Sequence, residues 1–342
     1  MRILAILTVR DEGAFLLEWL AHHRAAGITD FLVFSNDCSD GTAELLNRLA
    51  TLGLIVHIPN PGPYHKRGIQ FTALELASRH HLIAEADWIL PLDIDEFVNV
   101  HVGDHRLPDL IDAAPEATAI TLTWRLFGNA GVMRYEDGSL LDTFTQAAPE
   151  ILHWPWRAAM FKTLYKNDGT YRKPGVHRPR APRPDRLEEA RWFDGHGRQL
   201  DARFLEGKVF SDFGRPNYGL AQLNHYPLGA MESFVLKADR GRAVHAEDGL
   251  GLDYWIERNF EDEEDTSIGA LRAPRQAILE GLKADSEIAR LHAAAVDWRH
   301  RRFATLMQSE ANRALFGRLL MAAPSGVLPA ALAEAIRAYS RP

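Results

Sequence analysis

The chain has 342 residues, of which 46% are hydrophobic and 25% charged, and its formal net charge is −7. These proportions are typical of a folded globular protein, and the length exceeds that of one typical domain. A negative balance argues against a nucleic-acid-binding protein, which usually carries a basic surface. Cys38 is the single cysteine. An internal disulfide is therefore excluded, and the composition fits a reducing compartment.

The hydrophobic runs are too short to cross a membrane. No stretch of about 18 apolar residues occurs, which is the length that a spanning helix requires. The apolar run at 3–9 is shorter than the core of a signal peptide, and charged residues follow it at once. We therefore expect a cytoplasmic protein, compatible with peripheral contact at the inner membrane. The sequence indicates no oligomeric state.

Strands and helices alternate over the first hundred residues. Apolar runs predict buried strands, and Gly27 and Gly53 are placed to end the first two helices. Asp11 or Glu12 is placed to cap the first helix. The predicted strands are 3–9, 31–34, 54–58 and 88–92, and the third helix covers about 68–84. This alternation predicts a mostly parallel sheet flanked by helices, with right-handed crossovers.

The loops that follow these strands carry polar side chains. Parallel strands end at one edge of a sheet, where ligands bind in open α/β folds. The loops after the four strands should therefore meet in one cleft. They carry Arg10, Glu12, Asn36, Asp37 and Asp93.

The triplet Asp93-Ile94-Asp95 directly follows the strand at 88–92. Two carboxylates separated by one residue project the same way from an extended segment. They can bind one hard divalent cation through oxygen, and that cation can hold a diphosphate. The alternative is a solvated acidic turn.

Beyond residue 100 the alternation weakens. We expect a short helix at 107–113, strands at 119–124 and 223–227, and a basic helix at 232–242. From about residue 272 the chain is rich in Ala, Leu, Arg and Glu, which predicts two or three helices. The expected organisation is a larger α/β domain over 1–265, with one half at about 1–100 and the other at about 101–265, and a helical extension over 266–342.

Five short motifs occur in a characteristic order. They are Thr8-Val9-Arg10-Asp11-Glu12, Asn36 to Thr42, Leu92 to Phe97, Trp124 to Gly128, and Asn224-His225-Tyr226. Together they resemble the family-2-like glycosyltransferases of the GT-A (Rossmann-like) fold, most closely the branch allied to family 92, over residues 1–240. The first two loops depart slightly from the family pattern, at Asp11 and at Asn36-Asp37.

The resemblance implies transfer of a sugar from a nucleotide-diphosphate donor, UDP-linked by preference, to a glycan or other hydroxyl acceptor. It also implies a Mn²⁺ or Mg²⁺ cofactor and inversion at the sugar. On this resemblance, 1–265 is the catalytic domain, with the donor half at about 1–100 and the acceptor half at about 101–265. Asp95 is the expected direct metal ligand, with His225 completing the coordination and Asp93 on the ribose side or a further ligand. The residues expected to contact the donor are Thr8, Arg10, Glu12, Asn36, Asp37, Arg67, Gln70 and Asp93.

The catalytic base and the acceptor site are open at this point. An inverting enzyme needs a carboxylate to deprotonate the acceptor hydroxyl, and the candidates are Glu96, Glu232 and Asp265, with Asp248 as a further option. The expected acceptor residues are Trp124, Phe127, Gly128, His177 and Tyr226. Aromatic rings can pack on the C–H faces of sugars. Lys237, Arg240 and Arg242 either neutralise the diphosphate or form a solvated basic face.

Three other functions share part of this pattern. A nucleotidyltransferase would carry a glycine-rich basic loop after its first strand, unlike 9–13. A hydrolase with an Asp-x-Asp nucleophile would carry its aspartates after the first strand rather than the fourth. A non-catalytic module that binds a sugar or a nucleotide is the third alternative, against which the intact Asp93 and Asp95 pair argues.

Overall fold

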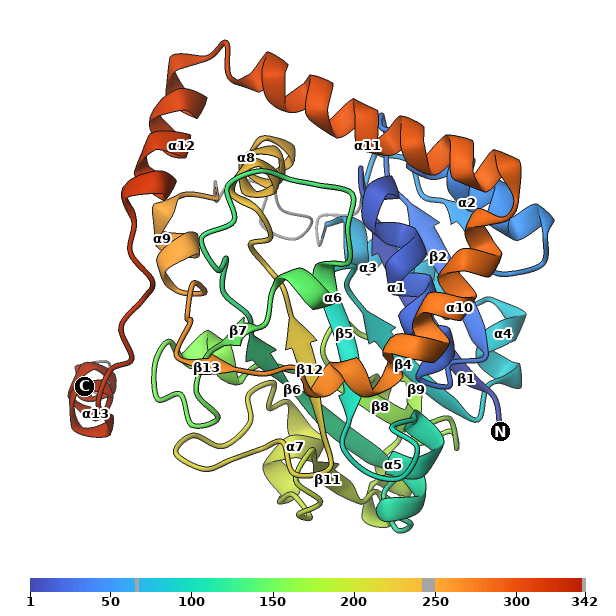
Figure 1. Cartoon of the computed structure of the whole chain (residues 1–342). Helices are drawn as coiled ribbons and strands as arrows, with labels where there is room; N and C mark the ends of the chain where they lie inside the picture. The colour runs from blue at the N-terminus through green and yellow to red at the C-terminus, as the bar shows by residue number, and fades with distance from the viewer. Residues whose placement is uncertain (65–67, 242–249, 340–342) are drawn as a thin grey trace.

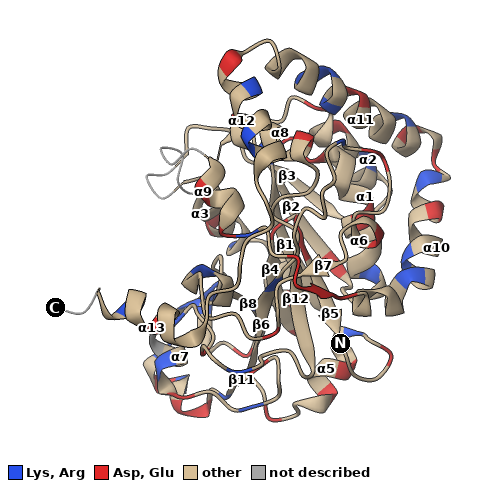
Figure 2. Cartoon of the chain, turned by 60° about the vertical axis from the view of Figure 1, so that its left-hand side comes forward, with Lys and Arg blue, Asp and Glu red and all other residues tan. Residues whose placement is uncertain are grey.

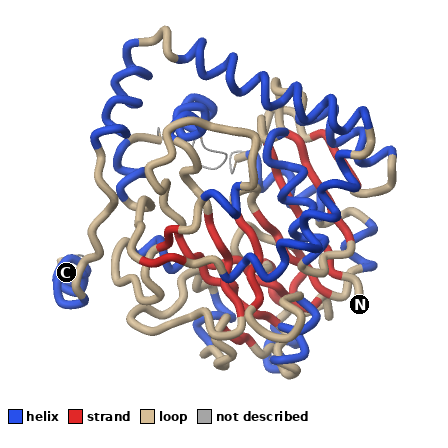
Figure 3. The backbone as a smooth tube through the Cα atoms, in the orientation of Figure 1, coloured by secondary structure: helices blue, strands red, loops and turns tan. Residues whose placement is uncertain are grey.

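The computed structural model describes residues 1–64, 68–241 and 250–339 (Figure 1). A mixed β-sheet, with parallel and antiparallel strands, runs through the molecule, and helices pack on it (Figure 3). In the described part of the chain its strand order is β3-β2-β1-β4-β8-β6-β12-β5, and β11 pairs with β6. The predicted fold class, a mostly parallel sheet flanked by helices with a helical C-terminal part, is confirmed.

The N-terminal half contains the predicted parallel strands. They are β1 (Ile3–Val9), β2 (Asp30–Ser35), β3 (Val56–Pro59) and β4 (Trp88–Leu92), each parallel to its neighbours in this group. Alternate residues of β1 face two hydrophobic clusters, Ile3 and Leu7 on one side and Leu4 and Ile6 on the other. Both faces of the strand are therefore covered, which explains its continuous apolar sequence.

The helices between these strands differ from prediction in two details. They are α1 (Gly13–Ala25), α2 (Thr42–Thr51), α3 (Ile69–Ala77) and α4 (His81–Glu85). The single helix predicted at 68–84 is two helices, because the chain turns at Ser78 and His80 accepts a hydrogen bond from Leu82 N as a new N-cap. Neither acid before α1 caps it. Asp40 instead accepts a hydrogen bond from Gly13 N at 2.9 Å.

The second half of the sheet mixes strand directions. Its strands are β5 (Glu96–Val100), β6 (Ala119–Leu126), β8 (Phe161–Lys166), β11 (Trp192–Asp194) and β12 (Ala221–His225). Strand β8 is antiparallel to β4 and β6, and β5 is antiparallel to β12. Short strands pair outside this sheet, β7 (Gln146–Ala147) with β13 (Glu263–Glu264) and β9 (Tyr171–Lys173) with β10 (Arg180–Pro182).

The connection between β4 and β5 makes the sheet curl. Only Asp93, Ile94 and Asp95 join the two strands, although β8, β6 and β12 lie between them in the strand order. The step from Leu92 to Glu96 can span at most about 14 Å. The sheet must therefore bend back on itself, so that the end of β12 lies beside the Asp93–Asp95 turn. Tyr226 N confirms this with a hydrogen bond to Asp95 O at 2.8 Å.

Shorter helices surround the second half. They are α5 (Leu107–Ala113), α6 (Leu140–Thr143), α7 (Ala202–Glu206), α8 (Met231–Arg240) and α9 (Leu252–Ile256). The helix predicted at 107–113 and the strand predicted at 119–124 are confirmed, the strand continuing to Leu126.

The C-terminal part has more helices than the two or three predicted. They are α10 (Arg272–Lys283), α11 (Ser286–Leu306), α12 (Glu310–Met321) and α13 (Ala330–Ala338). Helices α10 and α11 pack on α1, and α11 also contacts α2 and α8. Helices α10 and α11 both carry acidic and basic residues (Figure 2). Arg48 of α2 forms an ion pair with Asp285 at the start of α11, at 2.5 Å. No helix in the described ranges is both long and apolar enough to cross a bilayer.

Candidate active site

Helix α1 fixes the turn that carries Asp93 and Asp95 through hydrogen bonds from Trp19. Trp19 Nε1 donates hydrogen bonds to the backbone carbonyls of Asp93 and Glu96, each at 3.1 Å. Glu96 Oε2 accepts a hydrogen bond from Asp93 N at 2.8 Å. The two aspartates are therefore presented by a rigid loop, and each enters a different set of contacts.

Asp93 belongs to an inner network of buried charges. Its Oδ2 atom lies 2.8 Å from Lys162 Nζ, and its Oδ1 atom accepts a hydrogen bond from Gln70 Nε2 at 2.7 Å. Lys162 is 1% exposed and lies 3.5 Å from Glu96, whose Oε1 atom accepts a hydrogen bond from Trp124 Nε1 at 2.7 Å. We call Asp93, Glu96, Trp124 and Lys162 the inner network.

Burial sets the protonation of the inner network. Loss of solvent, with the nearby charges of Asp93 and Asp95, raises the pKa of Glu96 to about 8 although Lys162 opposes the shift. Burial acts to lower the pKa of Lys162, but the charges of Asp93 and Glu96 outweigh it and the pKa is raised. Lys162 is thus a cation held between two acids.

Asp95 belongs to a second group that faces solvent-accessible space. Its Oδ2 atom lies 2.7 Å from Lys237 Nζ and 3.7 Å from His225 Nε2. Burial alone would raise the pKa of Asp95, but Lys237 and His225 hold it well below its usual range. Burial lowers the pKa of His225, which keeps its ring neutral, and His225 Nδ1 has no hydrogen-bond partner among the described residues. We call Asp95, His225 and Lys237 the cleft group.

The loops after β1, β2 and β4 converge on one cavity, as predicted, whereas the described residues 60–64 of the loop after β3 do not line it. This donor cleft has a volume of about 540 Å³. Ten residues singled out in the sequence line it: Thr8, Arg10, Glu12, Asn36, Gln70, Asp93, Asp95, Trp124, His177 and His225. Lys237 and Arg240 line it as well. These two cations of α8 are largely buried, with 21% and 18% of their side chains exposed, so they do not form a solvated face.

Two predicted donor contacts have other roles or positions. Asn36 is buried, and its Nδ2 atom donates to Val9 O at 2.8 Å while its Oδ1 atom accepts from Asn60 at 2.5 Å. Its side chain thus ties three strand-end loops together. Asp37 does not line the donor cleft and accepts a hydrogen bond from Tyr64 OH at 2.5 Å. Arg67 lies outside the described residues.

The proposed acceptor residues divide into two groups. Trp124 and His177 face each other at the donor cleft, with ring centroids 5.8 Å apart. Phe127 is 1% exposed and packs on Tyr226, which places it in the core. Gly128 is a packing position, because an added Cβ would lie 2.4 Å from the carbonyl oxygen of Phe260. The prediction that Phe127 and Gly128 face an acceptor therefore does not match their positions.

None of the described candidates for the base faces the donor cleft. Glu96 is 0% exposed and bound within the inner network. Glu232 accepts a hydrogen bond from Tyr135 N at 3.1 Å, and Asp265 accepts hydrogen bonds from Gln222 and Ser267. Neither of them lines the cleft. Asp248, the fourth candidate, falls outside the described residues, as does Arg242.

The predicted three-residue metal site is not assembled as such. In the described part of the chain, the one cluster of three ligand-type side chains within 4.8 Å is Asp11, Cys38 and Asp40. Asp11 and Asp40 accept backbone hydrogen bonds there, and burial raises the pKa of the Cys38 thiol to about 11, so this cluster organises a loop. Asp95 and His225 remain as an ionised carboxylate and a neutral imidazole, which suit a divalent cation.

Sequence reasoning missed Lys162. It lies in β8, where the side chains around it are Phe161, Thr163 and Leu164, all buried. A lysine inside an otherwise buried strand is rare unless it is paired. That pattern could have predicted a buried ion pair, but not which acid forms it.

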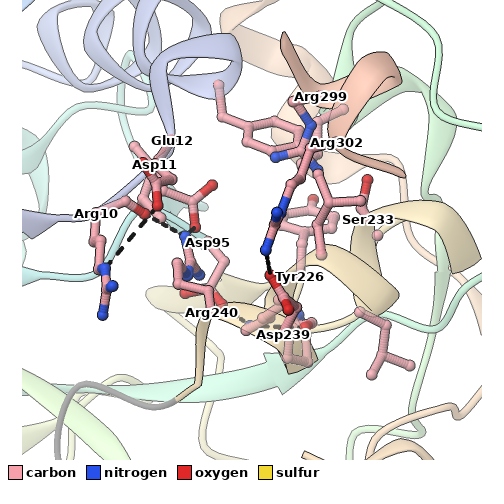
Figure 4. Close-up of a pocket in the computed structure, with 18 of the residues that line it drawn as sticks. Arg10, Asp11, Glu12, Asp95, Tyr226, Ser233, Asp239, Arg240, Arg299 and Arg302 are labelled. Atoms are coloured by element: carbon pink, nitrogen blue, oxygen red, sulfur yellow. Dashed lines mark hydrogen bonds and ion pairs between the residues drawn. The ribbon is translucent and has the colours of Figure 1, made fainter. Parts of the chain in front are cut away.

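A second cavity of about 420 Å³ adjoins the donor cleft (Figure 4). It lies among α1, α8 and α11, and it shares Arg10, Glu12, Asp95, Lys237 and Arg240 with the donor cleft. Tyr226, an expected acceptor residue, lines this side cavity. The paired side chains Glu12–Arg240 and Asp95–Lys237 therefore form a shared wall.

Comparison with solved structures gives weak likenesses. Staphylococcus aureus TarS 1–349 in complex with UDP has 15% identity and a TM-score of 0.31, covering 49% of this chain and 47% of that chain. A putative glucose-1-phosphate thymidylyltransferase from Bacillus anthracis has 13% identity and a TM-score of 0.27, covering 48% of this chain and 72% of that chain. Likenesses at these scores carry no argument about the site.

Comparison at the sequence level is more informative. A family 92 glycosyltransferase protein of Oryza sativa subsp. japonica is 22% identical over 246 residues, which is 70% of this chain and 35% of that protein. The chain thus spans about a third of the length of this relative. The model of glycosyltransferase family 92 matches residues 8–180, just over half of the chain, including the turn with Asp93 and Asp95. The chain belongs to glycosyltransferase family 92.

Proposed function

We propose that this protein transfers a sugar from a nucleotide-diphosphate donor to a hydroxyl group of a glycan or similar acceptor. The observation that carries this proposal is the donor cleft, where Asp95, His225, Lys237 and Arg240 meet at the carboxyl ends of β1 and β4. A leaving diphosphate gains negative charge as the sugar departs, and this group supplies positive charge at one wall. We further propose that residues 1–265 form the catalytic unit and that 266–342 brace it.

The donor nucleotide is proposed to lie along the strand-end loops. A uracil ring offers one N–H and two carbonyl oxygens. Arg10 and the backbone after Thr8 provide donors at the cleft, and Glu12 provides an acceptor. UDP-linked sugars are therefore the preferred donors. Gln70 and Asp93 are hydrogen-bonded at 2.7 Å and form the floor on the ribose side.

The diphosphate is proposed to face the cleft group. Lys237 and Arg240 can donate charge-assisted hydrogen bonds to phosphate oxygens. Asp95 and His225 are the residues that would hold Mn²⁺ or Mg²⁺, which when bound supplies Lewis-acid stabilisation of the leaving group. His225 is suited to this because burial keeps its ring neutral.

The acceptor sugar is proposed to pack on Trp124 and His177. Burial lowers the pKa of His177 to about 4, so its ring is neutral near pH 7 and offers an uncharged surface. Inversion needs a carboxylate base. In the described ranges, the carboxylates that line the donor cleft are Glu12, Asp93 and Asp95. Each of these three is paired with a cation, Asp93 with Lys162, Asp95 with Lys237 and Glu12 with Arg240. We therefore assign the base to none of them.

A thermal-shift screen tests the donor assignment. UDP, GDP and CMP are added singly to the full chain, each with and without MnCl₂, and the Tm is recorded. A ligand present at about 100 times its Kd stabilises the folded state by about 2.7 kcal/mol. We expect UDP with Mn²⁺ to raise the Tm most. MnCl₂ alone and uridine are the controls, and the absence of a shift with every nucleotide would favour a non-catalytic protein.

A further inference from the structure

The side cavity contains one cation more than it has carboxylates to pair. Arg10 lies 4.0 Å from Asp11, Lys237 lies 2.7 Å from Asp95, and Arg302 lies 2.7 Å from Asp239. Arg240 pairs with Glu12. Arg299 of α11 is the fifth cation of the lining, and it makes no hydrogen bond or ion pair with any residue in the described ranges. Figure 4 shows Arg299 beside Arg302 at this cavity.

The side chain of Arg299 is held in place by contacts that leave its N–H groups without hydrogen-bond acceptors among the described residues. It is 5% exposed, and its guanidinium carbon lies 4.5 Å from the ring centroid of Phe15 and 4.8 Å from that of Tyr135. Contacts of this kind use the face of the guanidinium. Its N–H donors lie in its plane, and the buried Nε atom has no acceptor among the described residues. Burial of an unpaired charge is costly, so the rings alone do not account for this arginine.

A second polar group of the same cavity is also unpartnered. Ser233 is 8% exposed, and its Oγ atom is buried without a hydrogen bond in the described part of the chain. Trp298 lines the cavity next to Arg299 and adds an apolar surface. The cavity thus offers three groups that suit an anionic sugar. The unpaired guanidinium of Arg299 is a planar fork for a carboxylate or phosphate. The hydroxyl of Ser233 can form a further hydrogen bond, and the indole ring of Trp298 is a stacking surface.

We propose that the side cavity binds a negatively charged substituent of the acceptor, a carboxylate or a phosphate, with Arg299 as its ionic partner. This inference rests on the proposed function. The cavity lies across the Glu12–Arg240 and Asp95–Lys237 wall from the side of the donor cleft that contains Asn36 and Gln70. An anion at Arg299 therefore lies beside the cleft group and away from Asn36, Gln70 and Asp93, none of which lines the side cavity, and we assign it to the acceptor rather than to the nucleotide.

Fluorescence titration of the full chain tests the inference, with Trp298 as a reporter inside the cavity. The probes are glucuronate, glucose 6-phosphate and neutral glucose, each titrated with UDP and MnCl₂ present. We expect one of the two anionic sugars to bind the wild-type protein at least tenfold more tightly than glucose. Tighter binding of glucuronate identifies a carboxylate acceptor, and tighter binding of glucose 6-phosphate identifies a phosphorylated one.

Variants then connect this preference to Arg299. Arg299→Met should remove the preference for the anionic sugar and leave UDP affinity unchanged, and its Tm should be equal or higher, because an unpaired buried charge is gone. Arg299→Lys should retain part of the preference. Arg290→Met is the matched control, since Arg290 lies on the exposed side of α11 and pairs with Glu287.

The outcomes separate this inference from the proposed function. Absence of UDP binding to the wild-type protein contradicts the proposed function. If UDP binds but neither anionic sugar binds more tightly than glucose, the inference is overturned and the donor assignment stands. The inference is likewise overturned if Arg299→Met retains the anion preference, or if this variant has a lower Tm and a weaker affinity for UDP, which would show that Arg299 is structural.

Discussion

Asp93 and Asp95 lie two residues apart in one turn, yet they contact different partners from different parts of the fold. Asp93 is part of the inner network, where Lys162 is 1% exposed and Glu96 is 0% exposed. Asp95 is part of the cleft group, whose members line cavities of about 540 Å³ and 420 Å³. Asp93 lines the larger cavity as well, but its partners Lys162 and Glu96 lie behind it and line neither cavity, whereas the partners of Asp95, which are His225 and Lys237, themselves line the donor cleft.

This difference indicates separate roles for the two aspartates of one motif. We expect Asp93 to support the turn and Asp95 to take part in the reaction. Residues 93–95 form a turn rather than an extended segment, so the two carboxylates do not project the same way as predicted. Asp93 contacts Lys162 of β8, and Asp95 contacts Lys237 of α8 and His225 at the end of β12. Four predictions test whether the two regions are as distinct as their contacts indicate.

The largest effect is expected from Lys162→Met in the inner network. Removing one partner of a buried ion pair costs about 3–5 kcal/mol, because Asp93 and Glu96 would be left without their cation. Urea denaturation measures the loss in the free energy of unfolding. Lys173→Met is the control, since Lys173 is 48% exposed and its pair with Glu75 should contribute less than about 1 kcal/mol. A loss below that value for Lys162→Met would contradict the closed inner network.

The next effect concerns turnover. Asp95→Asn should lower kcat by about 10²–10³-fold, the range found when one preorganised charge-stabilising group is removed. A fall in Tm should accompany it, because Lys237 loses its partner. Asp93→Asn should lower the Tm more than the turnover. Steady-state kinetics with the donor found by thermal shift measure both variants. Equal kinetic effects of the two substitutions would show that the aspartates share one role.

A smaller effect is expected where the two regions touch. Trp124 donates to Glu96 and stacks near His225, with ring centroids 4.3 Å apart. Trp124→Phe preserves a ring but leaves a buried Glu96 oxygen unsatisfied, which costs about 1–3 kcal/mol. Chemical denaturation checks the value, with Trp156→Phe as the exposed control. Unchanged stability would mean that the indole N–H does not support the inner network.

The smallest effect is a pH dependence beneath the turn. Burial lowers the pKa of His22 to about 4 and that of His23 well below its usual value, and both rings hydrogen-bond to backbone. The unfolded chain therefore binds more protons below about pH 6.5. Stability should be fully present above that pH and fall by up to about 1.4 kcal/mol per pH unit per histidine below it. Urea unfolding at pH 7 and pH 5.5 measures this.

His22→Gln provides the control for that pH dependence, because it removes one titrating ring. Its unfolding free energy should change less between the two pH values than that of the wild-type protein. An identical pH dependence in both proteins would mean that other groups cause the change.

Local patterns in the sequence identified the first half of the fold and the cleft. Strands β1, β2 and β4 are buried on both faces, so their sequences are mostly apolar runs, and the polar residues after them meet at one edge. Arg10 and Asp95 line the same cavity for this reason, whereas their predicted roles stay predictions. The edge strand β3 is only partly buried. The family 92 match over residues 8–180 contains four of the five motifs on which the resemblance was based.

The inner network and the side cavity could not be predicted in the same way. Lys162 meets Asp93 because β8 pairs with β4 across about 70 residues of sequence, and no local pattern reports such a pairing. Gly128 belongs to a family motif, but its position is explained by its contact with Phe260. Arg299 lies in a helix without any motif, and its role depends on α11 packing on α1 and α8.

The curled sheet has a consequence for the order in which the protein is made and folds. β4 and β5 are synthesised early, but the partner of β5 is β12, more than 100 residues later in the chain. A nascent chain that ends before His225 has the Asp-x-Asp turn without the strand that orients it. Pairings across long sequence separations form slowly. Donor binding should therefore be among the last properties gained during folding, and UDP can serve as a probe of the final step.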